Sequence, residues 1–370
     1  MKIAMIGQKG IPSRAGGVEI HVEEIASRLA GSGCSVYVFC RKGYSGINTG
    51  KVYKNINIRF VPYIGTKHLD AITHTFSSTI AALLMGCDIF HYHALGPATL
   101  SFIPKIFGKK VVCTVHGLDW QRRKWGAFAS RYLKFGEYAT AKFSNAVINV
   151  SRNLVDYYKK KYNKDTVYIP NGVEKGEFRQ PDIISKNYGL VKDEYILFLA
   201  RLVPEKGAHY LIDAFNRLNC CKKLAISGCS SHSDKYEAEL HKMASDNSNI
   251  VFTGFVAGDE LEELYSNAYL YILPSDIEGL PISLLEAMSF DNCCLTSDIP
   301  ENADVVKDMG YTFKKSDVAD LSEKLEMLIN QEEKVYAVKK NVCRNILEEY
   351  NWDDAAEKTL AVYKKLMMDR

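Results

Sequence analysis

Residues 1–40 read MKIAMIGQKGIPSRAGGVEIHVEEIASRLAGSGCSVYVFC. Their apolar runs predict strands over Lys2–Ile6 and Ser35–Cys40, and the apolar periodicity between them predicts a helix over Val18–Ala30. A glycine-rich loop joins the first strand to this helix. A strand, a helix and a strand in this rhythm form a βαβ unit, so we expect the two strands to pair in parallel.

The same alternation continues in two series along the chain. In the first series, further strands are expected at Asp88–His91, Val111–Val115, Ala146–Val150 and Val167–Ile169. After the turn signal Pro170-Asn171-Gly172, a second series of strands is expected at Tyr195–Leu199, Leu224–Ser227, Ile250–Thr253, Tyr269–Leu273 and Cys293–Ser297. Helical patterns lie at Ala208–Leu218, Lys235–Ser245, Glu260–Ser266, Pro281–Ser289, Leu321–Leu328, Val335–Glu349 and Trp352–Met368.

These patterns predict an α/β fold with two Rossmann-like, doubly wound domains. We expect a first domain over residues 1–170 and a second over residues 171–351. Parallel sheets of this kind bind ligands at the carboxyl ends of their strands, so the loops that follow the strands are the places to search for a site.

Composition agrees with a globular enzyme of about two domains. The chain has 370 residues, 47% of them hydrophobic, and a formal net charge of +3. This excludes disordered, collagen-like and small disulfide-stabilised proteins. Residues 1–180 carry 26 Lys and Arg against 11 Asp and Glu, whereas residues 181–370 are acidic. A basic half suits phosphates, nucleic acid or an anionic membrane.

The cysteine pattern and the hydropathy indicate a cytoplasmic protein. None of the ten cysteines forms a Cys-x-x-Cys pair, so we expect reduced thiols and no zinc site of that type. The apolar run at the N-terminus is too short for a secretory signal. Polar residues interrupt the longest apolar stretch, Ile72–Ile89, so any contact with the cell membrane should be peripheral and on its inner face.

Three loops combine glycine or basic residues with a strand end. The first, over residues 7–19, contains Gly16 and Gly17 before a helix, where backbone N–H groups can approach an anion. It matches neither Gly-x-Gly-x-x-Gly nor a P-loop, so close packing on the sheet is the alternative. The second, over residues 200–207, carries Arg201 and Lys206, which can neutralise a diphosphate, although such pairs are often only solvated.

The third loop, over residues 274–288, contains two glutamates eight residues apart. Glu278 precedes the expected helix and Glu286 projects from its second turn. Free N–H groups at the helix start, with Gly279 allowing close approach, suit phosphate, while carboxylates suit the hydroxyl groups of a sugar. Each glutamate alone is more often a solvated or dipole-compensating residue.

Histidines follow the strands of the basic half. His116 ends one strand, while His91 and His93 end the preceding one, and a strand-end histidine is more often structural than catalytic. The three together raise the possibility of a metal site. No Asp-x-Asp accompanies them, so we expect no metal.

A basic aromatic segment spans residues 120–135. Trp125, Phe128, Tyr132 and Phe135 recur on one helical face beside Arg122, Arg123, Lys124, Arg131 and Lys134. Such a helix can bind an anionic membrane surface. The alternative is that the aromatic stripe packs into the core.

Four features occur together in this chain: Arg201 with Lys206, the pair Glu278-x7-Glu286, His116 and the Gly16-Gly17 loop. This combination resembles the group 1 retaining nucleotide-sugar glycosyltransferases. Their GT-B fold has two Rossmann-like domains that face a cleft. The resemblance runs almost end to end. The start, IGQKGIPSRAGGVEIHVEEIA, resembles a bacterial rhamnosyltransferase-like branch that acts in surface-polysaccharide assembly.

The resemblance implies roles for individual residues. Arg201 and Lys206 would hold the diphosphate, and Glu286 the ribose. Glu278, His116 and the backbone of Gly279, Leu280 and Pro281 would contact the donor sugar. Gly16 and Gly17 would approach the phosphate or sugar, and Phe252–Val256 would lie beside the base. It also implies that the last helix, within residues 352–370, returns to the first domain.

The resulting expectation is a metal-independent, retaining transfer from a nucleotide diphosphate sugar, with UDP or dTDP favoured, to a lipid-linked saccharide. No separate cofactor is expected. Charge stabilisation of the leaving diphosphate by Arg201, Lys206 and helix N-termini fits this chemistry. The alternatives are a nucleotide-sugar epimerase or hydrolase of the same fold and a nucleic-acid-binding protein that uses the basic half. The chain has no recognisable nucleic-acid-binding motif, so we expect no nucleic-acid partner.

Overall fold

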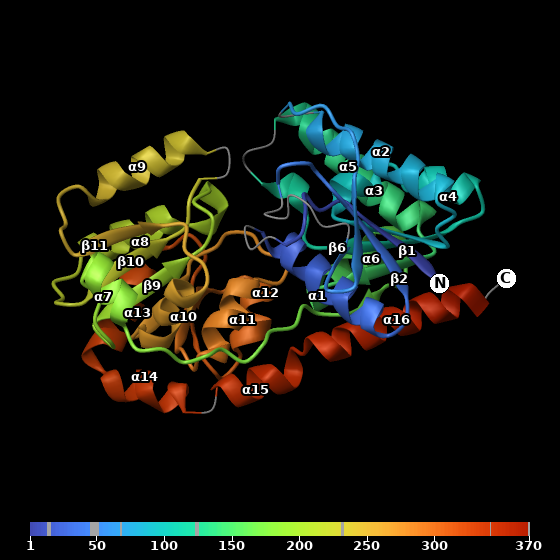
Figure 1. The fold of residues 1–370 in the computed structure, drawn as a ribbon. Helices are drawn as coiled ribbons and strands as arrows, with labels where there is room; N and C mark the ends of the chain where they lie inside the picture. The colour runs from blue at the N-terminus through green and yellow to red at the C-terminus, as the bar shows by residue number, and fades with distance from the viewer. Residues whose placement is uncertain are drawn as a thin grey trace. The chain divides into compact units, whose positions relative to one another are not determined.

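A computed structural model describes residues 1–12, 16–44, 52–66, 69–122, 126–230, 233–340 and 342–368. The chain divides into two compact units, which are drawn in Figure 1. Unit 1 comprises Met1–Asn171 together with Asn351–Arg370, and unit 2 comprises Gly172–Tyr350. Each unit is built on its own sheet of largely or wholly parallel strands, as the alternation of strands and helices predicts.

Unit 1 contains an eight-stranded sheet in the order β3-β4-β2-β1-β5-β6-β7-β8. Its strands are β1 (Lys2–Ile6), β2 (Ser35–Cys40), β3 (Val52–Tyr53), β4 (Ile56–Phe60), β5 (Ile89–His93), β6 (Lys110–Val115), β7 (Ala146–Asn149) and β8 (Val167–Tyr168). Every pair is parallel except the β3–β4 hairpin. The central strand β1 pairs with β2 on one side and β5 on the other, which confirms the predicted βαβ start.

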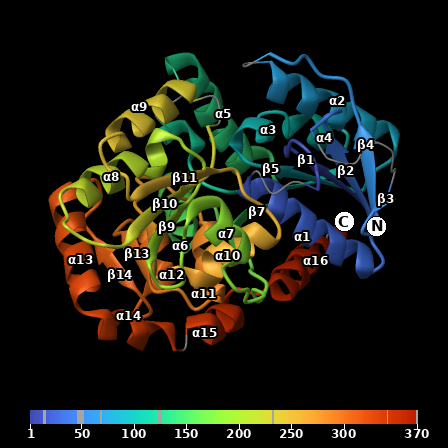
Figure 2. The same cartoon turned by 60° about the vertical axis from the view of Figure 1, so that its left-hand side comes forward.

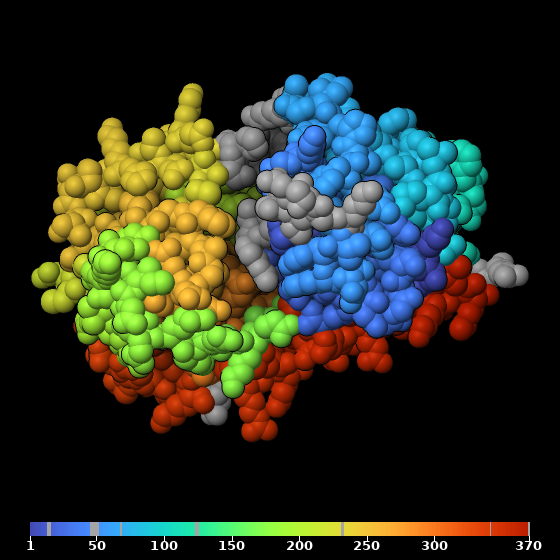
Figure 3. Space-filling view, in the orientation of Figure 1, coloured from blue at the N-terminus to red at the C-terminus, as the bar shows by residue number. Residues whose placement is uncertain are grey.

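Helices pack on this sheet and complete unit 1. They are α1 (Gly17–Gly31), α2 (Asp70–Leu84), α3 (Leu95–Ala98), α4 (Phe102–Ile106), η1 (Asp119–Gln121), α5 (Ala127–Phe143), α6 (Arg152–Tyr162) and α16 (Trp352–Met368). The C-terminal helix α16, drawn in red, lies along the blue α1 (Figures 1 and 3). The Tyr363 hydroxyl of α16 is hydrogen-bonded to His91 Nδ1 at 2.5 Å, inside the unit.

Unit 2 contains a six-stranded, wholly parallel sheet in the order β11-β10-β9-β12-β13-β14, seen from a second side in Figure 2. Its strands are β9 (Tyr195–Leu199), β10 (Lys223–Ser227), β11 (Ile250–Gly254), β12 (Leu270–Leu273), β13 (Cys294–Ser297) and β14 (Tyr311–Phe313). Its helices are α7 (Asp182–Tyr188), η2 (Pro204–Lys206), α8 (Ala208–Asn216), α9 (Asp234–Ala244), α10 (Asp259–Asn267), α11 (Ile282–Ser289), α12 (Pro300–Val306), α13 (Val318–Asn330), α14 (Glu332–Lys339) and α15 (Val342–Glu349).

The strand order fixes where each unit can bind a ligand. In unit 2 the chain winds outward in opposite directions from β9 and β12, which are neighbours. In unit 1 the same reversal falls between β1 and β5. Ligands of doubly wound sheets bind outside the carboxyl ends of the strands at such a reversal. The loops after β9 and β12, and those after β1 and β5, are therefore the candidate binding loops.

Two features differ from the sequence predictions. The single helix expected over Val335–Glu349 is two helices, α14 and α15, with residue 341 between them outside the described parts of the chain. The sequence patterns also missed β3 and β14, because strands of two or three residues carry too little alternation to be recognised, and they missed the five-residue strand β4. Among the described residues, no helix is long and apolar enough to cross a bilayer.

Candidate functional site

An ion pair joins the two candidate loops of unit 2. Lys206, in the loop after β9, donates from Nζ to Oε1 of Glu278, in the loop after β12, at 2.5 Å. The side chains are only 14% and 8% exposed. Because buried charges are costly unless paired, this contact fixes both side chains at the carboxyl edge of the sheet. Two residues that the sequence analysis placed in one site are therefore in direct contact.

The two loops also meet through their backbones. Gly207 has a φ of +73°, and a Cβ atom there would collide with the carbonyl oxygen of Pro274. Only glycine combines this left-handed conformation with so close an approach. The Asp276 N–H donates to the Glu205 carbonyl at 2.9 Å. The position of Lys206 relative to the second loop is thus set by the main chain as well as by its ion pair.

Sequence reasoning missed two buried acidic residues of the same two loops, Asp276 and Glu205. Asp276 is buried and accepts hydrogen bonds from the Tyr210 hydroxyl at 3.2 Å and the Ser316 hydroxyl at 2.7 Å. Glu205 is 3% exposed, and neither of its carboxylate oxygens has a hydrogen-bond partner among the described residues. An acidic residue directly before Lys206 was the only signal in the sequence, and spacing alone does not show that it is buried.

Glu286 lies on α11, in the position that the eight-residue spacing from Glu278 predicts. The Tyr265 hydroxyl donates to Glu286 Oε2 at 3.2 Å. Burial, and then the Glu286 charge, raise the pKa of Tyr265 well above its ordinary value, so the hydroxyl keeps the proton that it donates. Tyr265 therefore orients the carboxylate of Glu286.

Three residues lead into α11, namely Gly279, Leu280 and Pro281, and all are buried. Pro281 is the N-cap rather than the first helical residue, so the helix begins one residue later than the sequence pattern predicted. Helix starts carry backbone N–H groups without intrahelical partners. This end of α11 therefore presents donors beside the ion pair of Lys206 and Glu278.

Two further predicted residues flank the same edge. Arg201 lies two residues after the end of β9 and is partly exposed, and its backbone carbonyl accepts from the Val203 N–H at 2.9 Å. Val256 follows β11 and is 7% exposed, next to the half-exposed Phe255. Arg201 offers a cation and the segment around Val256 offers an apolar surface.

The glycine loop of unit 1 is packed closely on the sheet. A Cβ at Gly7, whose φ is +127°, would collide with the His93 carbonyl oxygen. Gly16 is the N-cap of α1 and Gly17 its first residue. The Lys9 N–H donates to Glu19 Oε1 at 2.9 Å, so a carboxylate of the chain itself binds one loop amide. The close-packing alternative therefore describes Gly7, and an anion site at the start of α1 stays a prediction; residues 13–15 of the loop lie outside the described ranges.

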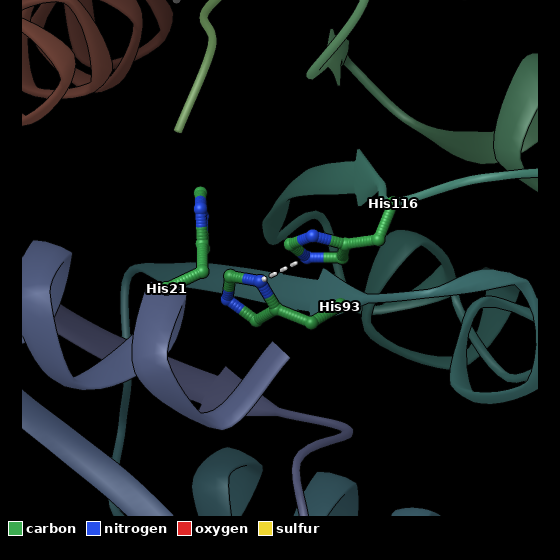
Figure 4. A group of neighbouring side chains, drawn as sticks. All are labelled: His21, His93 and His116. Atoms are coloured by element: carbon green, nitrogen blue, oxygen red, sulfur yellow. Dashed lines mark hydrogen bonds between the residues drawn. The ribbon is translucent and has the colours of Figure 1, made fainter. Parts of the chain in front are cut away.

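His116 lies in unit 1 just after β6, beside two other histidines (Figure 4). Its Nε2 is 3.3 Å from His93 Nδ1. The third member is His21 of α1, whose ring centroid is 4.7 Å from that of His116. Burial lowers the pKa of His21 to about 4, partly offset by its hydrogen bond to Asn171, and burial lowers the pKa of His93 and His116 well below the ordinary value.

His91 does not belong to this group, contrary to the trio considered from the sequence. Its Nδ1 is hydrogen-bonded to the Tyr363 hydroxyl at 2.5 Å and its Nε2 to the Thr114 hydroxyl at 2.7 Å. Both ring nitrogens of His91 are therefore occupied by hydroxyl groups. The sequence analysis missed His21, because a position on an amphipathic helix does not show which strand ends the side chain faces.

The structure describes only part of the basic aromatic segment, residues 120–135. Residues 123–125, including Arg123, Lys124 and Trp125, lie outside the described parts of the chain. Arg122 pairs with Asp119 at 2.9 Å. Within α5, Tyr132 packs inward and its hydroxyl is hydrogen-bonded to Thr99, whereas Phe128 and Phe135 are 81% and 47% exposed. The aromatic residues of α5 therefore pack only partly into the core.

Family models match most of the chain in two parts. Residues 181–343 match the model described as glycosyl transferases group 1, and residues 15–176 match the model described as Glycosyltransferase Family 4. This chain belongs to the group 1 glycosyltransferases. It is therefore an enzyme of glycosyl transfer, and its two Rossmann-like units are those of the GT-B fold.

Individual relatives and solved structures agree with this assignment. An uncharacterized glycosyltransferase of Methanocaldococcus jannaschii is 27% identical over 99% of each chain. The N,N'-diacetylbacillosaminyl-diphospho-undecaprenol alpha-1,3-N-acetylgalactosaminyltransferase of Campylobacter jejuni is 24% identical over 61% of this chain and 62% of that one. Sucrose-phosphate synthase from Thermosynechococcus elongatus has a TM-score of 0.87 over 100% of both chains at 18% identity. Anabaena HepE in complex with UDP-glucose has a TM-score of 0.81 at 16% identity over 99% of this chain and 100% of that one.

Proposed function

We propose that this glycosyltransferase moves a sugar from a nucleoside diphosphate sugar to a lipid-linked saccharide in the assembly of a surface polysaccharide. A UDP or dTDP donor is favoured, and the resemblance at the N-terminus favours rhamnose as the sugar. The observation that carries the proposal is the contact between Lys206 and Glu278 at the strand reversal of unit 2. This contact supports the proposal, because a cation that could bind phosphate lies beside a carboxylate that could accept from sugar hydroxyl groups.

The ion pair suggests how the donor would be received. Without donor, the ammonium of Lys206 and the carboxylate of Glu278 neutralise each other. A diphosphate carries more negative charge than one carboxylate and would compete for the ammonium. Glu278 would then be released to accept hydrogen bonds from the hydroxyl groups of the sugar. Arg201 would hold phosphate oxygens in two-point contacts that Lys206 cannot make.

The transfer step follows from the same charges. Lys206, Arg201 and the N–H groups at the start of α11 would stabilise the negative charge that develops as the diphosphate leaves. We propose a front-face displacement, in which the acceptor hydroxyl bonds to the anomeric carbon as the bond to the diphosphate breaks. The leaving phosphate takes the proton of that hydroxyl. The anomeric configuration is retained, and no metal ion on the diphosphate is required.

Other residues would position the donor. Glu286, oriented by Tyr265, would accept from the ribose hydroxyl groups. The backbone of Gly279, Leu280 and Pro281 would contact the sugar, and Val256 would lie beside the base.

We further propose that unit 1 binds the cytoplasmic face of a membrane through the exposed face of α5. Phe128, Arg131, Phe135 and Tyr138 recur at intervals of three, four and three residues, so they share one side of the helix, and all are exposed. Aromatic rings next to a cation suit the boundary between headgroups and acyl chains of an anionic leaflet. A lipid-linked acceptor would be met at the same surface. The name of the Campylobacter jejuni relative, which includes an undecaprenol diphosphate, supports this acceptor class.

Replacing both Phe128 and Phe135 by serine is expected to weaken binding to anionic vesicles at least about tenfold. Each ring removed from water contributes roughly 1.5–3 kcal/mol when fully buried, and tenfold corresponds to about 1.4 kcal/mol. Co-sedimentation with phosphatidylcholine vesicles, with and without phosphatidylglycerol, measures the effect. Phe178→Ser, at a 55% exposed phenylalanine of unit 2, is the matched control and should bind as the parent does. Equal pelleting with neutral and anionic vesicles, or none with either, contradicts the proposal.

The donor assignment is tested by thermal unfolding in the presence of UDP, dTDP and GDP. A ligand at 100 times its dissociation constant stabilises the folded state by about 2.7 kcal/mol. One of the three diphosphates should therefore raise the melting temperature, and the same compound should have a smaller effect on Lys206→Ala. An unchanged melting temperature with all three, at millimolar concentration, contradicts a donor site in this chain.

A further inference from the structure

A buried tyrosine of unit 2 meets the carboxylate of Glu286. Tyr265 comes from α10, is 1% exposed, and has its hydroxyl 3.2 Å from Glu286 Oε2 on α11. The same hydroxyl is 3.3 Å from the Ser283 carbonyl oxygen. A phenol has one proton to donate, and a hydrogen bond to a charged acceptor is stronger than one to a neutral carbonyl. The carboxylate of Glu286 is therefore the favoured acceptor.

Packing holds the tyrosine in this place. Its ring stacks on Phe290 at the end of α11, with ring centroids 5.4 Å apart and an angle of 20° between the planes. The Asn292 side chain donates to the Tyr265 carbonyl at 2.8 Å and to the Ala287 carbonyl at 3.1 Å, which ties α10 to α11. The direction from which the hydroxyl meets Glu286 is therefore set by the fold.

The chemistry of the pair fixes which partner donates. Burial, and then the charge of Glu286, raise the pKa of Tyr265 well above its ordinary value, so the phenol keeps its proton. A carboxylate can only accept, and it offers about four lone-pair positions. The contact with Tyr265 is therefore compatible with further hydrogen bonds from hydroxyl groups to the same carboxylate.

Other buried tyrosines of unit 2 make a different kind of contact. The Tyr195 hydroxyl donates to the Leu264 carbonyl at 2.6 Å, and the Tyr271 hydroxyl to the Leu199 carbonyl at 3.2 Å. Both of these contacts satisfy backbone groups and serve the packing of the sheet. Tyr265 differs from them because its hydroxyl acts on a side chain that the donor site uses.

We propose that Tyr265 is a positioning residue that makes Glu286 selective for the 3′-hydroxyl group of a nucleoside diphosphate. The inference rests on the function proposed above, in which Glu286 accepts from the ribose. A flexible glutamate that is held before binding loses less entropy when the ligand arrives. A site built to accept from a hydroxyl group also rejects a ligand that lacks it, because the buried acceptor is left unpaired. The 3′-hydroxyl is the informative group, since ribose and 2′-deoxyribose both carry it.

The test is calorimetric titration of the full-length protein with the nucleoside diphosphate that stabilises it and with the 3′-deoxy analogue of that compound. The quotient of the two dissociation constants is the 3′-hydroxyl ratio. We expect a ratio of at least about 10 in the parent and of about 3 or less in Tyr265→Phe, which keeps the ring and removes only the hydroxyl. Most of the change should be weaker binding of the natural nucleotide. A purely structural role would weaken both ligands alike, so an unchanged ratio in Tyr265→Phe overturns the proposal.

Further variants separate positioning from stability. Tyr195→Phe removes an equally buried hydroxyl, so it is the matched control and should keep the ratio of the parent even if it lowers the melting temperature. Glu286→Gln should itself lower the ratio, and adding Tyr265→Phe to it should change the ratio no further. Glu286→Gln with the parent's ratio overturns the proposal without any need for the tyrosine variant. A parent that binds no nucleoside diphosphate overturns the proposed function as well, whereas a parent that binds the diphosphate and its 3′-deoxy analogue equally overturns only this inference.

Discussion

Replacing Lys206 by alanine is expected to lower kcat/KM for sugar transfer at least about 100-fold, which is about 2.7 kcal/mol of transition-state stabilisation. The reason is that the leaving diphosphate loses a cation placed at the strand reversal of unit 2. Glu278→Ala should have an effect of similar size, because the sugar loses its carboxylate partner. Steady-state kinetics with the donor found by the nucleotide screen measures both.

Stability must be separated from catalysis in this experiment, since each single variant leaves a buried charge without its partner. The loss can reach about 3 kcal/mol of folding free energy. The double variant Lys206→Ala/Glu278→Ala removes both charges, so it should recover part of the lost stability but none of the lost turnover. Arg217→Ala breaks a half-exposed pair with Asp213 and should leave both quantities nearly unchanged. Near-normal kcat/KM in Lys206→Ala would remove the assigned role.

Unit 1 is expected to lose stability in acid between about pH 6.5 and 4. Burial lowers the pKa of His21 to about 4, and burial with the nearby Arg41 charge lowers that of His74 to about 4, both from 6.5. The unfolded chain therefore binds protons at a higher pH than the folded chain does. The stability that the neutral rings contribute is complete above pH 6.5 and decreases as the pH falls toward 4. Each ring can contribute up to about 3 kcal/mol.

Tryptophan fluorescence isolates this effect, because the range of unit 2 contains no tryptophan. Urea unfolding at pH 7, 5.5 and 4.5 should show a falling midpoint. His74→Gln should reduce the slope of stability against pH in this window, while His241→Gln should not alter it. A midpoint in the parent that is constant from pH 7 to 4.5 would contradict neutral burial of these histidines.

The fold was largely predictable from local pattern. The bounds of β1, β2 and β9 were predicted to the residue, because each is a run of apolar residues ended by turn-forming or charged ones. The strands β3 and β14 were missed because they are short, and the five-residue strand β4 was missed as well. The break between α14 and α15 was missed because the apolar spacing continues across the gap. Such breaks are set by tertiary packing rather than by residue preference.

The candidate site was predictable only in part. Lys206 and Glu278 could be assigned to one site because each follows a strand and the family pattern contains both. Their direct contact depends on β9 and β12 being neighbours, which is set by the order of strands and not by their sequence separation. The burial of Glu205 and the proximity of His21 to His116 likewise depend on the packing of segments that are distant in the sequence, which residue spacing does not show.

We propose that this chain transfers sugar from a nucleotide donor that unit 2 holds through Lys206 and Glu278. The most direct measurement is incubation of the full-length protein with radiolabelled UDP-, dTDP- or GDP-sugars and the lipid fraction of the producing cells, followed by organic extraction. We expect label in the lipid-linked fraction from one donor class, with the matching nucleoside diphosphate released in equal amount. Labelling by Lys206→Ala should be at least about 100-fold slower. Labelling that is as fast with Lys206→Ala as with the parent, or no transfer from any of the three donor classes, would contradict it.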